Sequence, residues 1–124
     1  MNREKTILLV DDKLLILNIC KQVLEINGYR VLTASTPSEA IHESENYNGE
    51  IHLLLTDIMM PRMNGIELSK QLQSIRKNMK VLFMSGYPAN YLADEGVDFD
   101  IRDLIQKPFT MDDLIRKVNS TLKK

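Results

Sequence analysis

The sequence predicts an α/β domain in which a doubly wound, five-stranded parallel sheet lies between two layers of helices. Short runs rich in apolar residues alternate along the chain with longer stretches whose apolar residues recur at the helical period. Parallel neighbours in a sheet need crossover connections, and these longer stretches can supply them as helices on both faces. The 124 residues, 44% of them hydrophobic, suit one domain spanning residues 1–124, without an internal repeat or a break in composition.

The five strands are expected where the chain is rich in apolar residues over four to six positions. In chain order they are ILLV (7–10), YRVLTA (29–34), IHLLLT (51–56), KVLFM (80–84) and IRDLIQ (101–106). Each is followed by residues that stop a strand or carry charge, so the runs are separate strands of one sheet.

The first two helices are marked by their ends. An amphipathic helix is expected over residues 13–27, and it ends at Gly28, because glycine is the usual residue just beyond a helix C-terminus. A short second helix is expected to begin at Pro37, since proline suits the first helical position. Thr36 and Glu39 have the spacing of a capping box, which supports the same start.

Three further helices complete the alternation. They are expected at about residues 66–75, at about 89–95, and from the cap Thr110 through residue 122. The last of them carries two aspartates in its first turn, where the helix dipole favours negative charge. With the first two, these helices cover both faces of the predicted sheet.

Composition and charge exclude several kinds of partner. Sixteen basic residues are scattered among seventeen acidic ones for a net charge of -1, so we expect no direct contact with nucleic acid or with a membrane. The single Cys20 excludes a disulfide framework and is expected to be a small buried hydrophobe. No apolar run approaches a membrane span, and the start of the chain passes too quickly into a strand to be a signal peptide. We therefore expect a cytoplasmic domain.

Polar residues follow four of the five predicted strands. Ligands of doubly wound sheets bind outside the carboxyl ends of the strands, so these residues are expected to converge on one edge. They are Asp11 and Asp12 after the first strand, Asp57 after the third, Ser85 after the fourth and Lys107 after the fifth. Each alone could be a helix cap or a solvated surface residue. Together they predict a site with three carboxylates, a hydroxyl and an ammonium group.

These residue types predict a particular chemistry. Three neighbouring carboxylates repel one another unless a cation lies between them, and an all-oxygen site suits Mg²⁺. One carboxylate could attack the phosphorus of an incoming phosphoryl group held by that ion, which would form an aspartyl phosphate. Lys107 would neutralise charge on the transferred group, and the Ser85 hydroxyl could donate a hydrogen bond to it.

These motifs resemble the receiver domain of two-component response regulators over essentially the whole chain. The matching segments are LLVDDK, LLLTDIMMP, MSGYP and QKPF. The resemblance implies the flavodoxin-like receiver fold with strand order 2-1-3-4-5. It assigns Asp57 as the phosphoacceptor, Asp11 and Asp12 as metal ligands beside Asp57, and Ser85 and Lys107 as partners of the phosphoryl group.

The same resemblance implies smaller details of the site. Met59 would give its backbone carbonyl to the metal, and the peptide bond before Pro108 would be cis. In the family an aromatic ring three positions before the lysine often moves inward on activation, but here that position is Leu104, so signalling by a ring flip is not expected. Tyr87 and Met59 stand where receivers control access of the hydrolytic water, and their bulk predicts restricted entry.

Other classes fit less well. A haloacid-dehalogenase-type phosphatase also uses an aspartyl nucleophile with Mg²⁺, and its nucleophile lies in a DxD motif after the first strand. In this chain Asp11 follows the first strand, but the residue two positions on is Lys13, so the motif is not present there. The glycines never approach the spacing of a dinucleotide-binding Rossmann motif. A flavodoxin would need a phosphate-binding loop after the first strand, where Asp11 and Asp12 would repel the phosphate. A receiver-like scaffold that signals by binding alone remains open. His42 and His52 have no second ligand at metal spacing and are expected to be ordinary residues.

The resemblance also implies the partners. The phosphoryl donor would be a phosphohistidine of a histidine kinase or phosphotransfer domain, recognised mainly through Leu14, Leu15 and Asn18 of the first helix. Output would be a shift in the packing of the fourth helix, fifth strand and fifth helix, with a homodimer as one possible result. The segment from MSGYP to QKPF is similar to receivers at the carboxyl end of hybrid sensor histidine kinases, so both a hybrid kinase and a single-domain regulator stay open. The domain itself would lose its phosphoryl group only slowly.

Overall fold

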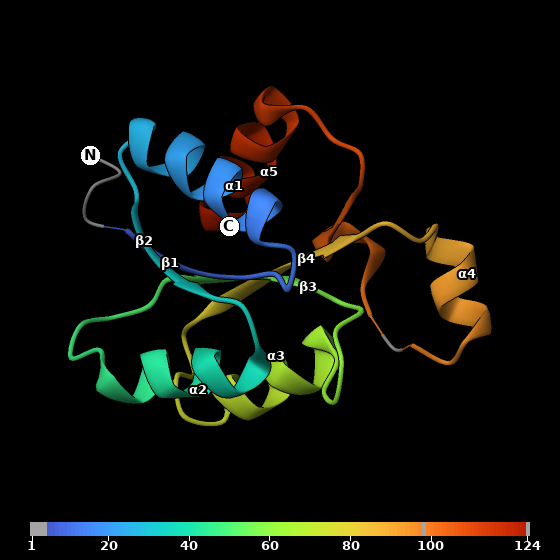
Figure 1. Ribbon diagram of the computed structural model, residues 1–124, viewed down its shortest axis with the longest axis horizontal. Coiled ribbons are helices and arrows are strands. Elements are labelled where there is room, and N and C mark those ends of the chain that lie inside the picture. Colours follow the sequence, from blue (N-terminus) through green and yellow to red (C-terminus); the bar gives the residue numbers. More distant parts are fainter. Residues whose placement is uncertain (1–4, 98, 124) are drawn as a thin grey trace.

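A single five-stranded parallel sheet organises the molecule (Figure 1). A computed structural model describes residues 5–97 and 99–123. The strand order is β2-β1-β3-β4-β5, and every neighbouring pair is parallel, which confirms the predicted topology. The described helices are too short and too polar to cross a membrane.

The elements lie close to their predicted positions. The strands are β1 (Thr6–Val10), β2 (Arg30–Ala34), β3 (Leu53–Asp57), β4 (Lys80–Ser85) and β5 (Leu104–Gln106). The helices are α1 (Leu14–Ile26), α2 (Pro37–Asn46), α3 (Gly65–Gln73), α4 (Ala89–Asp94) and α5 (Met111–Lys123).

Local chemistry explains the helix ends. Gly28 has a φ of 95° just after α1, the left-handed conformation that glycine adopts without strain. The Thr36 hydroxyl accepts the Glu39 N–H at 3.0 Å at the start of α2, as predicted. The Glu39 carboxylate reaches back one residue further than in a standard capping box and accepts the N–H of Ser35 at 2.8 Å. Thr110 caps α5 as expected, accepting the N–H of Asp113.

The fifth strand is shorter than predicted. Its first three expected residues instead form a 3₁₀ turn, η2 (Ile101–Asp103), and only residues 104–106 pair with β4. The cause is local hydrogen bonding around Asp100, whose carboxylate accepts the Arg102 N–H and whose carbonyl accepts the Asp103 N–H. Half of β4 is therefore left without a β5 partner, since their register begins at Phe83.

Helices cover the sheet on both faces, as Figure 1 shows, with α1 and α5 on one face and α2 and α3 on the other. The α1 and α5 face buries residues such as Leu24, Leu82 and Val118. The opposite face buries Leu54 and Leu68 among others. Because β1 and β3 are buried along their whole length, the sheet forms a rigid floor whose strand ends cannot move independently.

Candidate phosphoryl-transfer site

The ends of β1, β3, β4 and β5 bring the predicted polar residues to one edge of the sheet. Asp57 is the last residue of β3 and Ser85 is the last residue of β4, so the sheet itself fixes both backbones. Asp11 directly follows β1, and its backbone N–H donates to the Ala34 carbonyl at 3.2 Å. The side chains that follow parallel strands thus meet where the topology predicts.

Three carboxylates form a tight cluster at this edge. Oxygens of Asp11, Asp12 and Asp57 all lie within 4.8 Å of one another. Asp11 and Asp57 are buried, whereas Asp12 faces solvent at the rim. The Lys13 backbone N–H donates to Asp11 Oδ1 at 2.9 Å and so fixes the orientation of that carboxylate, a contact that the sequence did not predict.

Lys107 supplies the positive charge inside the cluster. Its Nζ lies 2.8 Å from Asp11 Oδ2 and 3.8 Å from Asp57 Oδ2. The side chain is 16% exposed, so the ammonium interacts with both carboxylates in a largely desolvated setting. Its backbone N–H donates to the Ser85 carbonyl at 2.7 Å, and the peptide bond to Pro108 is cis, as the resemblance implied.

The electrostatics of Asp57 differ from those of an ordinary aspartate. Burial disfavours its charged form and raises its pKa from 3.8 to about 6, and the neighbouring Asp11 adds to this effect. Lys107 acts in the opposite direction but does not compensate fully for the burial. A further cation that enters the cluster would stabilise the ionised form of Asp57.

Ser85 is at the site, but its hydroxyl is turned toward the following loop. Ser85 Oγ donates to the Tyr87 carbonyl at 3.0 Å and accepts the Tyr87 N–H at 2.9 Å. The Gln106 side chain donates to the Ser85 and Tyr87 carbonyls and so ties β5 to the loop after β4. Nothing in the amino-acid sequence indicates this role of Gln106, because a polar residue at a strand end is usually only solvated.

The loop after Asp57 packs against the back of the site. A side chain at Gly65 would place its Cβ 2.3 Å from the Asp57 carbonyl oxygen, so only glycine allows α3 to start this close to β3. The Gly65 N–H donates to the Ile58 carbonyl at 2.8 Å, and Asn64 and Glu67 form a complete capping box at the start of α3. Met59 lies in this loop with its side chain exposed, and its role as a carbonyl ligand stays a prediction.

The donor set can hold a divalent cation. Carboxylate oxygens are the ligands that Mg²⁺ prefers, and one exposed and two buried carboxylates leave room for water and for a ligand at the rim. Among the described residues this is the only group of three or more acidic, histidine or cysteine side chains close enough to share an ion. His42 and His52 lie outside it, and His52 instead accepts the Thr6 N–H through Nδ1.

Comparison with known proteins identifies the class. The sequence profile described as "Response regulator receiver domain" matches residues 7–119. The response regulator SaeR of Staphylococcus aureus strain USA300 is 28% identical over 116 residues, which are 94% of this chain and 50% of SaeR. This chain thus spans about half the length of the curated relatives that it matches.

Solved structures agree. A CheY-like receiver domain protein from Methanospirillum hungatei JF-1 has 36% identity and a TM-score of 0.80, with 96% of this chain and 94% of that chain covered. The receiver domain of the hybrid histidine kinase CckA has 30% identity and a TM-score of 0.77, with 94% and 98% covered. The chain belongs to the response regulator receiver family and is a receiver domain of two-component signalling.

Proposed function

We propose that this receiver takes a phosphoryl group from a phosphohistidine onto Asp57 in a Mg²⁺-dependent reaction. The observation that carries the proposal is the position of Asp57 Oδ2, which is buried at the end of β3 between an acidic cluster and the Lys107 ammonium. Burial of this carboxylate, which raises its pKa, lowers the stability of the fold. A role of Asp57 in the reaction explains why a carboxylate is nevertheless buried there.

Transfer forms one bond and breaks another. An Asp57 oxygen attacks phosphorus, the bond between phosphorus and the donor imidazole nitrogen breaks, and the electron pair stays on that nitrogen. Asp11, Asp12 and Asp57, with the Met59 carbonyl, would hold Mg²⁺, which would supply positive charge for the phosphoryl oxygens. Asp11 also keeps Lys107 in place, through the 2.8 Å contact between Oδ2 and Nζ.

Lys107 and Ser85 recognise the product. Lys107 lies close enough to Asp57 that its ammonium can move to a phosphoryl oxygen on that residue without a change of backbone. The Ser85 hydroxyl would exchange its bond to the Tyr87 carbonyl for one to the phosphoryl group. Since Gln106 holds that same carbonyl, the exchange alters the contact between the loop after β4 and β5.

Output would therefore be a shift in the packing of α4, β5 and α5. The absence of an aromatic ring at Leu104 means that the loop from Ser85 to Tyr87 carries the change, without a ring flip. Tyr87 and Tyr91 stack with ring centroids 4.9 Å apart on the exposed side of α4, so a movement of Tyr87 is transmitted directly to that helix. A homodimer formed through this face is one possible output.

The donor would be a histidine kinase or phosphotransfer domain in the cytoplasm, and α1 would be its main contact. Leu14 and Leu15 are 63% and 71% exposed next to the acidic site, which supports a docking role for an otherwise costly apolar surface. The similarity to the receiver of a hybrid histidine kinase supports the same kind of donor. A parent hybrid kinase and a separate regulator both remain compatible with this proposal.

Intact mass tests the proposal. The domain is incubated with Mg²⁺ and acetyl phosphate, in parallel with Asp57→Asn and with a sample containing a chelator. We expect one added phosphoryl group that requires both Asp57 and the metal. A folded, Mg²⁺-binding protein that forms no adduct, and that also forms no stable complex with beryllofluoride, would instead support a scaffold that signals by binding alone.

A further inference from the structure

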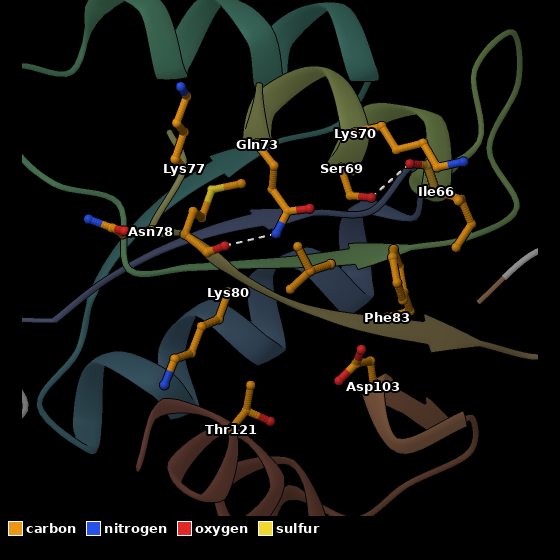
Figure 2. Close-up of a pocket in the computed structure, with 12 residues that line it drawn as sticks. Ile66, Ser69, Lys70, Gln73, Lys77, Asn78, Lys80, Phe83, Asp103 and Thr121 are labelled. Carbon is orange, nitrogen blue, oxygen red and sulfur yellow. Dashed lines mark hydrogen bonds between the residues drawn. The ribbon is translucent and has the colours of Figure 1, made fainter. Parts of the chain in front are cut away.

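A groove of about 510 Å³ lies beside the first half of β4, between α3 and α5 (Figure 2). Its floor is apolar and includes Ile66, Val81 and Phe83. Its walls are polar and come from α3, the loop before β4, η2 and the last turns of α5. The acidic site lies at the carboxyl ends of the strands, so this groove is a separate feature.

The groove exists because β4 has a free edge. On the β3 side, β4 is paired from Lys80 onward. On the β5 side, within residues 5–97 and 99–123, its pairing begins only at Phe83, because the preceding residues of β5 form the 3₁₀ turn. On this side Val81 and Leu82 have no strand neighbour among the described residues, and a strand edge of this kind can accept another strand.

The backbone of Val81 points to this open side. The Lys80 N–H donates to the His52 carbonyl and the Met84 carbonyl accepts the Ile58 N–H, so even-numbered residues of β4 face β3. The Ser85 carbonyl accepts the Lys107 N–H on the β5 side. The backbone N–H and C=O groups of successive residues point to opposite sides of a strand, so those of Val81 point toward the groove. A strand added on this side could form hydrogen bonds with them.

A second polar group in the groove also lacks a partner. Thr121 on α5 is 3% exposed, and within the described part of the chain its Oγ1 is the buried side-chain oxygen or nitrogen without a hydrogen bond. Such a group carries a desolvation penalty unless something binds it. Figure 2 shows Thr121 lining the groove across from α3, near Lys80 and Asp103.

The charge of the groove selects the partner. Among the described residues that line it, three are lysines (Lys70, Lys77 and Lys80) and one, Asp103, carries a carboxylate. The two faces of this strand edge differ in polarity. On the α3 side, Val81 packs against the hydrophobic core, and on the α5 side, Lys80 Nζ lies 3.4 Å from the Leu122 carbonyl. A strand added here would place apolar side chains toward α3 and acidic ones toward Lys80 and the Thr121 hydroxyl.

We propose that this groove binds a short extended segment of a partner protein in which acidic and apolar residues alternate. The segment pairs with the N–H and C=O of Val81, which have no partner among the described residues, and extends the sheet beside β4. A second copy of this chain is a poorer occupant, because pairing two such edges would bring the lysine-lined grooves of both copies together. A segment rich in lysine or arginine would be repelled by the lysines of the groove.

Nuclear magnetic resonance with a defined probe tests the proposal. The probe is a six-residue peptide of alternating glutamate and valine with blocked ends, titrated into ¹⁵N-labelled domain. We expect saturable shifts centred on the amides of Val81, Leu82 and Thr121, and slower hydrogen exchange of the Val81 amide when the peptide is bound. Shifts centred on α1 or α4, or no saturable shifts, would overturn the proposal.

Three controls separate strand addition from simple charge attraction. A peptide N-methylated at alternate positions loses the backbone donors for Val81 and is expected to bind about two- to tenfold more weakly. Lys70→Gln is expected to weaken binding about two- to fivefold, whereas Lys21→Gln on α1 leaves it unchanged. Thr121→Val keeps the shape, removes the hydroxyl and should weaken binding without lowering the midpoint of urea unfolding.

The other occupants give distinct results. Equal binding of the N-methylated peptide, or complete competition by millimolar sulfate, would show a site for small anions and overturn the proposal. Concentration-dependent self-association that protects Val81 without peptide would show that a second copy is the occupant. Peptide binding by Asp57→Asn at the wild-type level is expected, because the groove does not depend on the acidic site.

Discussion

Lys107 Nζ lies closer to Asp11 than to Asp57, at 2.8 Å against 3.8 Å. Asp11 is fully buried, so the lysine compensates a carboxylate that water cannot reach. The main electrostatic partner of Lys107 is therefore Asp11, and its contact with Asp57 is secondary. In the proposed reaction, this arrangement would leave the Asp57 oxygen available to a phosphoryl group.

Lys107→Met should destabilise the metal-free protein by about 3–5 kcal/mol, because it leaves the Asp11 carboxylate buried without its cation. Urea unfolding without divalent ions measures this. Lys13→Met is the matched control, since the Lys13 side chain is 64% exposed and its Nζ lies 3.8 Å from Asp12 Oδ1. Equal effects of the two substitutions would contradict the importance of the buried pair.

The raised pKa of Asp57 predicts how stability depends on pH. A folded-state pKa of about 6 against 3.8 means that the folded protein holds this proton more tightly, so its stability falls as pH rises from about 4 to about 6. Asp57→Asn lacks this loss and should gain up to about 3 kcal/mol over wild type across that window, without metal. Unfolding curves of both proteins from pH 4 to pH 7.5 measure the difference, and a difference that does not change with pH would exclude the raised pKa.

Gly65→Ala should be costly although alanine favours helices. The added Cβ would meet a backbone carbonyl oxygen at 2.3 Å, which cannot move without shifting Asp57 itself, so we expect a loss of about 1–3 kcal/mol and weaker Mg²⁺ binding. Gly86→Ala is the control, because its Cβ would meet nothing within 4 Å. Thermal unfolding and Mg²⁺ titration of both variants should separate them, and a neutral Gly65→Ala would contradict the close approach of α3 to β3.

Arg76 ties the C-terminal end of α2 to the segment after α3. Its guanidinium donates to Ser44 Oγ and to the carbonyls of Ser44, Tyr47 and Gly49. Arg76→Gln leaves several of these acceptors unsatisfied and should cost about 2–4 kcal/mol in urea unfolding. Arg102→Gln breaks an exposed pair with Asp100 and should leave the unfolding midpoint unchanged, so similar midpoints for the two variants would contradict this role of Arg76.

The sequence predicts the frame of the site well because the frame follows from topology. Once Asp11, Asp57 and Lys107 are placed after parallel strands, their convergence needs no knowledge of side-chain conformation. The position of Gly28 was equally predictable, since a helix end that needs positive φ selects glycine.

Features decided by competing hydrogen bonds were not predictable. The Ser85 hydroxyl binds Tyr87 because that loop offers both a donor and an acceptor at the right distance. The predicted start of β5 was wrong because the Asp100 carboxylate and carbonyl accept the N–H groups of Arg102 and Asp103. These N–H groups are therefore not available for pairing with β4. These outcomes depend on geometry that only the folded chain defines.

The identity of the phosphoacceptor is tested most directly by locating the phosphoryl group. The domain is treated with Mg²⁺ and a phosphoryl donor, reduced with borohydride to convert an acyl phosphate to an alcohol, and digested for peptide mass mapping. We predict homoserine at position 57 and unmodified aspartate at positions 11 and 12. Reduction at Asp11 or Asp12 with Asp57 intact, or a phosphoryl group that resists borohydride on another side chain, would contradict the assignment of Asp57.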